Sequence, residues 1–84
     1  MRLPVIKHLV EFVEENDEDY VVESIELLEH LSEAKGIKDE ELDVIGEILS
    51  NLYGALEVSK EIKDGTAKKD ALNSFMKRVT GSID

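Results

Sequence analysis

Hydrophobic residues recur at helical spacing in four successive segments of this chain. The first segment begins at Pro4, whose missing N–H costs nothing in the first turn of a helix, and ends before Asn16. The second begins after Asp17 or Asp19, either of which can cap a helix. It ends at Gly36, which has the position of a left-handed C-terminal cap. We therefore expect two helices in the first 36 residues.

The second half of the chain predicts one long and one short helix. Asp39 is the expected cap of the long helix, which runs for about 24 residues at helical periodicity until Gly65 stops it. Thr66 is the expected cap of the last helix, and Gly81 closes it. No segment alternates like a strand, and connections of about three to five residues favour antiparallel neighbours. We predict an all-α fold, a small bundle of four antiparallel helices with a long third helix, in a single domain over residues 1–84.

The predicted helix lengths do not match. At 1.5 Å per residue the third helix would be about 36 Å long, and the first and fourth about 18 Å each. A monomer must lay two short helices along the long one, bend the long one, or leave part of it uncovered. In the last case a second copy of the chain is the expected cover, so we predict a possible homodimer.

Small residues repeat every fourth position in the third predicted helix, at Gly46, Ser50 and Gly54. A glycine inside a helix costs about 1 kcal/mol relative to alanine, so two of them call for a packing reason. Close approach by a helix of the same chain or of a partner is one reason, and a bend at Gly54 is another. Apolar residues beside this ridge would supply contact energy. We predict an interaction surface made of Gly46, Leu49, Ser50, Tyr53, Gly54 and Leu56.

Charge is distributed unevenly along the chain. Twenty acidic and ten basic side chains give a formal charge of −10. Residues 1–59 hold sixteen of the acids and four of the bases, whereas residues 60–84 are slightly basic. This excess of acids disfavours binding to nucleic acids and to anionic membrane surfaces. The acids form either a solvated outer face or a docking surface for a basic protein partner.

Residues able to carry chemistry are few. The chain has no cysteine and no Gly-x-Ser-x-Gly sequence, and helical periodicity places its carboxylates outside the core. His8 and His30 each have a glutamate three residues later, the reverse of the Glu-x-x-His order found in di-metal bundles. We therefore predict no catalytic activity and no cofactor. The alternative is a helical protein that binds a metal ion or small ligand through His8 or His30 with neighbouring glutamates.

Targeting signals are also missing from the pattern. Lys7 and His8 interrupt the start before an apolar run reaches the length of a signal peptide. No apolar run approaches the ~20 residues that span a bilayer. We expect a cytoplasmic protein that does not associate with membranes.

Three segments carry a resemblance to a known family: Leu3–Lys7, Lys38–Gly46 and Ala71–Val79. With its overall pattern, the chain resembles a family of short, acidic, all-helical bacterial proteins of unknown function. The resemblance covers nearly the whole chain and implies no catalytic or binding residues. The function we expect is a non-catalytic protein-interaction module, self-associating through the third helix or docking a basic partner.

Overall fold

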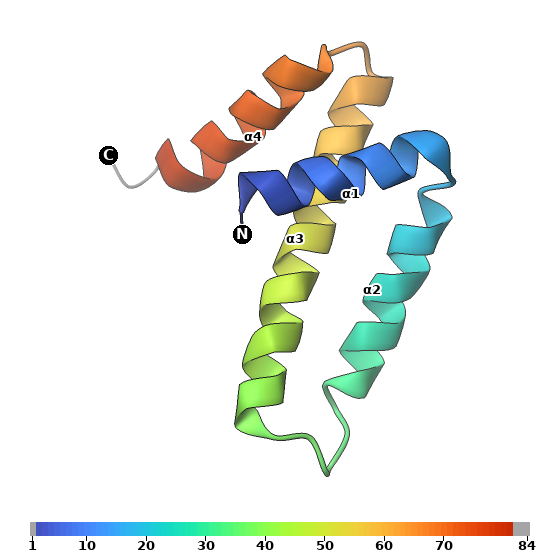
Figure 1. Cartoon of the computed structure of the whole chain (residues 1–84), viewed down its shortest axis with the longest axis vertical. Helices are drawn as coiled ribbons and strands as arrows, with labels where there is room; N and C mark the ends of the chain where they lie inside the picture. The colour runs from blue at the N-terminus through green and yellow to red at the C-terminus, as the bar shows by residue number, and fades with distance from the viewer. Residues whose placement is uncertain (1, 82–84) are drawn as a thin grey trace.

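Four helices make up the protein, as the sequence predicts, and the third is the longest (Figure 1). The structure is a computed structural model that describes residues 2–81, with side chains as far as Val79. The helices are α1 (Leu3–Glu15), α2 (Asp19–Leu31), α3 (Asp39–Lys63) and α4 (Lys68–Gly81). None of the described residues forms a strand. The all-α fold with a long third helix is therefore confirmed.

Helix α3 is the element against which the other three pack (Figure 1). Helix α2 runs antiparallel beside its N-terminal half, α1 crosses it, and α4 folds back from its C-terminal end. The molecule is flat, with extents of 43 × 35 × 17 Å. This arrangement resolves the mismatch in length, because α1 and α4 share one half of α3 while α2 covers one side of the other half.

Two clusters of buried side chains follow from this arrangement. The first joins α1, the C-terminal half of α3 and α4, and it contains Ile6, Val10, Ala55, Val58, Ala71, Leu72 and Phe75. The second joins α1, α2 and the middle of α3, and it contains Val13, Val21, Ile25 and Leu52. Leu9 packs against both clusters. The N-terminal part of α3 and the C-terminal part of α2 extend beyond the first of these clusters, which is the larger one.

The end of α2 differs from the sequence expectation. The helix ends at Leu31, and Gly36 does not adopt a positive φ. After Leu28 no further side chain of α2 packs into a core cluster, so nothing buried holds another turn of helix. The Ser32 hydroxyl donates to the carbonyl of Glu29 at 2.6 Å, a local bond that competes with helix continuation.

The end of α3 behaves as expected, at Gly65. This glycine has a φ of 107°, and its N–H donates to the carbonyl of Ile62. The N–H of Thr66 donates to the carbonyl of Glu61, which completes a Schellman motif. Thr66 therefore belongs to the end of α3. Helix α4 begins two residues later than its expected cap, at Lys68.

Candidate functional site

Gly54, the most informative residue of the predicted ridge, lies in the core. A Cβ atom on Gly54 would lie 3.0 Å from Ile6 Cδ1 and 3.0 Å from Phe75 Cζ. Helices α1 and α4 thus make the close approach that the glycine permits, and both belong to the same chain. Gly46, two turns earlier, is exposed and has nothing within 4 Å of its Cβ position.

The other predicted interaction residues do not form one exposed surface. Leu49 and Leu56 are half-buried against the second core cluster, and Ser50 is half-buried as well. Tyr53 is exposed, and its hydroxyl donates to the Glu29 carboxylate at 2.6 Å, joining α3 to α2. This hydrogen bond raises the pKa of Tyr53 above 10.0, and desolvation and the negative charge of Glu29 add to the effect.

Exposed apolar side chains gather on a different side of the molecule. Seven of the nine large hydrophobic residues that are exposed in the described part of the chain come from α2, the N-terminal half of α3 and the adjoining end of α1, and all of these except Val22 share one side of the molecule. We call this surface the apolar face; its residues are Phe12, Tyr20, Leu27, Leu31, Val44 and Ile48. Leu27, at 68% exposed, is the most accessible of them.

Three shallow hollows are lined by five of these six side chains, all except Leu27. The first, of about 250 Å³, lies between the start of α1 and α3, where Val5 and Leu9 face Val44 and Ile48. The second, of about 230 Å³, shares Leu9 and Leu52 with the first and adds Phe12, Tyr20 and Ser24. The third, of about 280 Å³, lies at the tip of the α2–α3 hairpin and is lined by Leu31, Ala34, Gly36, Ile37, Glu41 and Ile45. Together they place the apolar face on the side of the hairpin where α1 crosses.

Two contacts, one at each end of α1, hold this helix along the edge of the apolar face. The N–H of Arg2 donates to Asn51 Oδ1 at 2.9 Å, and the Asn51 amide donates to the carbonyl of Glu47, which satisfies a buried polar side chain. At the other end of α1, Phe12 and Tyr20 pack edge to face with ring centroids 5.8 Å apart. The edge of the apolar face is therefore fixed at both ends.

The same part of the molecule carries the net charge. We call residues 17–49 the arm: α2, the connection and the N-terminal part of α3. The arm contains twelve acidic and two basic side chains, a formal charge of −10 that equals that of the whole chain. Of its acids only Glu18 forms an ion pair within the described residues, with Lys63 at 3.1 Å. The other eleven acidic side chains of the arm form no ion pair with any side chain of residues 2–79.

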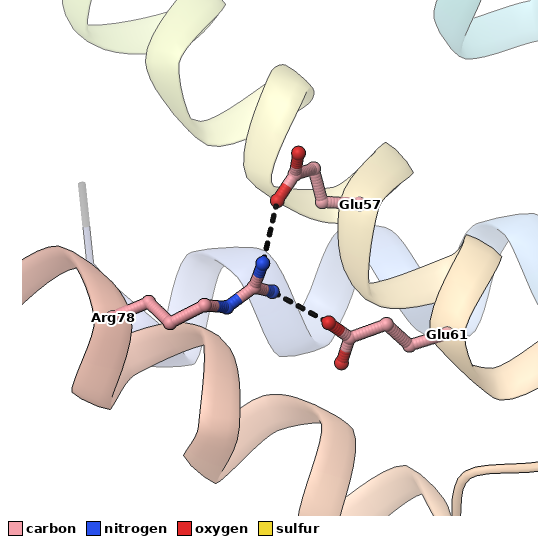
Figure 2. A network of polar contacts seen from close by, with 3 residues as sticks. All are labelled: Glu57, Glu61 and Arg78. Atoms are coloured by element: carbon pink, nitrogen blue, oxygen red, sulfur yellow. Dashed lines mark hydrogen bonds and ion pairs between the residues drawn. The ribbon is translucent and has the colours of Figure 1, made fainter.

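Two cations of α4, Lys68 and Arg78, are paired with acids outside the arm. Arg78 reaches two carboxylates one turn apart on α3, Glu61 at 2.6 Å and Glu57 at 3.5 Å (Figure 2). Lys68 bonds Glu14 of α1 at 2.8 Å, and this hydrogen bond raises the pKa of Lys68 above 10.5. These pairs connect α4 to α1 and α3, and none of them involves an acid of the arm.

The two histidines lie apart. His8 and His30 are both exposed, on different helices. Among the described residues no three side chains of the histidine, cysteine, aspartate or glutamate types are grouped closely enough to hold a metal ion. Over the same residues, no helix combines the length and apolarity needed to cross a membrane.

Helical periodicity alone places the residues of the apolar face among the core positions of their helices. Tyr20, Leu27 and Leu31 lie on the same side of α2, about 100° around the helix from the buried residues Val21 and Ile25. One neighbouring helix cannot cover two stripes so far apart. This double stripe was the signal in the sequence that could have revealed the apolar face.

Comparison with known proteins identifies a family without an assigned activity. A search of curated proteins finds no match, and neither does a search of solved structures. A family model described as "Family of unknown function (DUF6952)" matches residues 1–84. The expected resemblance to a family of unknown function is thus confirmed, and the chain belongs to DUF6952 over its whole length.

Proposed function

We propose that this protein is a non-catalytic interaction module that binds a protein partner on the apolar face of its arm. The observation that carries the proposal is the clustering of six exposed large apolar side chains on one side of the α2–α3 hairpin and the adjoining end of α1. Exposed apolar patches of this kind typically mark interaction sites. The two hollows that share Leu9 and Leu52 give the surface a relief that a partner can fill.

The energetics favour a partner of opposite charge. Burying an exposed Leu or Ile side chain contributes about 1.5–3 kcal/mol, so six half-exposed side chains supply a total similar to the ~4–15 kcal/mol cost of association. Apolar contact alone then gives weak binding, and charge decides which partner binds. The eleven carboxylates of the arm that form no ion pair within the described residues favour a basic partner and increase its rate of association.

A second copy of the chain fits this surface poorly. Joining two apolar faces would bring together two arms that each carry a formal charge of −10. We therefore propose that the apolar face binds a different protein. Self-association through α3 is one of the results that the crosslinking experiment below can detect.

We propose a non-catalytic role because neither group with a raised pKa lies buried in a cleft. Tyr53 is exposed and Lys68 is partly exposed, and hydrogen bonds to Glu29 and Glu14 on neighbouring helices explain the raised pKa values of both groups. Pairs of this kind fix helices, whereas catalytic acids and bases are shifted by burial in a cleft.

Site-specific crosslinking in native cell extract tests the proposal. A photo-crosslinking amino acid replaces Leu27 on the apolar face or, as the control, Val22, which is exposed on another side of the same helix. We expect a defined adduct from position 27 and none from position 22, and unlabelled wild-type protein should compete it away. Equal adducts from both positions, no adduct, or an adduct only with a second copy of this chain would overturn the proposal.

A further inference from the structure

We infer that the partner presents a single amphipathic α-helix with basic flanks, which lies lengthwise between α2 and α3 on the apolar face. This inference rests on the proposed function and specifies the secondary structure, length and charge of the segment that binds.

The backbone of the arm favours a helix over an extended segment. Both walls of the apolar face are helices, whose backbone N–H and C=O groups are bonded internally, and the described part of the chain offers no strand edge. An extended peptide on this apolar floor would leave its own backbone groups without partners. A helix satisfies those groups itself and presents only side chains.

The spacing of the apolar residues sets the length of the bound helix. From Tyr20 to Leu31 is eleven residues, which corresponds to about 16 Å or three helical turns. Leu27 and Leu31 on one wall are four residues apart, as are Val44 and Ile48 on the other. Rows with this spacing accept the ridges of a third helix, so the partner should carry apolar residues at i, i+4, i+7 and i+11.

Acidic side chains border the apolar face on both sides. Glu47 and Glu41 line the hollows along α3. Glu23 lies three residues after Tyr20 and four before Leu27, which places it along the edge of α2. A helix between these borders is complementary when lysine or arginine residues flank its apolar stripe on both sides.

Synthetic peptides test the inference by fluorescence anisotropy. The probe is a labelled peptide of about four turns with leucines at i, i+4, i+7 and i+11 and lysines on both flanks. Three matched peptides change one property each: rearranged leucines, glutamate in place of lysine, or a central proline that interrupts the helix. We expect the probe to bind wild-type protein at least about tenfold more tightly than any of the three.

Variants of the protein locate the binding. Leu27→Glu and Ile48→Glu should each weaken probe binding about tenfold or more, because each places a charge against the buried stripe. Val22→Glu, a change at an exposed position on another side of α2, should alter it less than about twofold. Circular dichroism of each variant verifies that it is folded.

The outcomes separate the inference from the proposed function. Equal binding of the proline peptide would refute the helix, and equal binding of the rearranged or acidic peptide would refute the stripe or the charge. If position 27 still crosslinks a partner in that case, the proposed function stands and only this inference fails. Probe binding without a cellular adduct would refute the proposed function and, with it, the inference about its partner.

Discussion

Two glycines in the same helix should respond in opposite ways to the same substitution. Gly54→Ala adds a methyl group that would lie 3.0 Å from Ile6 Cδ1, 3.0 Å from Phe75 Cζ and 3.1 Å from Phe75 Cε2. These distances are shorter than normal van der Waals contact, and the Phe75 ring, buried beneath α4, has little room to shift. Gly46→Ala adds the same methyl group where nothing lies within 4 Å.

The magnitudes follow from two opposing terms. Replacing glycine by alanine inside a helix gains about 1 kcal/mol at either position. At Gly54 the added methyl group also overpacks the core, which typically costs about 1–3 kcal/mol. We expect Gly46→Ala to stabilise the protein by about 1 kcal/mol and Gly54→Ala to destabilise it by about 1 kcal/mol.

Urea denaturation followed by helical circular dichroism measures both values. Because the two variants change the unfolded chain similarly, their difference of about 2 kcal/mol reports packing in the native state. A second substitution, Phe75→Leu, should reduce the penalty of Gly54→Ala in a double-mutant cycle. Gly54→Ala that stabilises as much as Gly46→Ala would refute the close packing of α1 and α4 on α3.

Two further substitutions test the polar contacts. The Ser59 hydroxyl is buried without a hydrogen-bond partner, so Ser59→Ala should raise the free energy of unfolding by about 1 kcal/mol; a loss of stability in urea would contradict this. Hydrogen bonds to carboxylates raise the pKa values of Tyr53 and Lys68 above 10.0 and 10.5, so the protonated forms favour the folded state. Their contribution is complete below pH 10.0 and is lost as the pH rises through the raised values. The free energy of unfolding should therefore fall as the pH rises above about 10, and less steeply in Tyr53→Phe, whereas identical slopes would count against the bond to Glu29.

Local sequence signals determined the helical elements. The four runs of helical periodicity correspond to the four helices, Pro4 lies in the first turn of α1, and Gly65 ends α3. These signals depend on residues within one or two turns of each other, so they can be read without knowing the packing. The predicted end of α2 at Gly36 was wrong because these local signals do not report packing, and no core contact supports the turn that leads to Gly36.

The candidate site depended on tertiary structure. Periodicity indicates which residues share a side of a helix, but burial depends on which neighbour covers that side, and the crossing of α1 over α3 decides this. That crossing directs Gly54 toward Ile6 and Phe75 and leaves Leu27 and Ile48 exposed. The sequence alone determined the helices and their charge; only the packing decided which apolar stripe closes the core and which one faces outward.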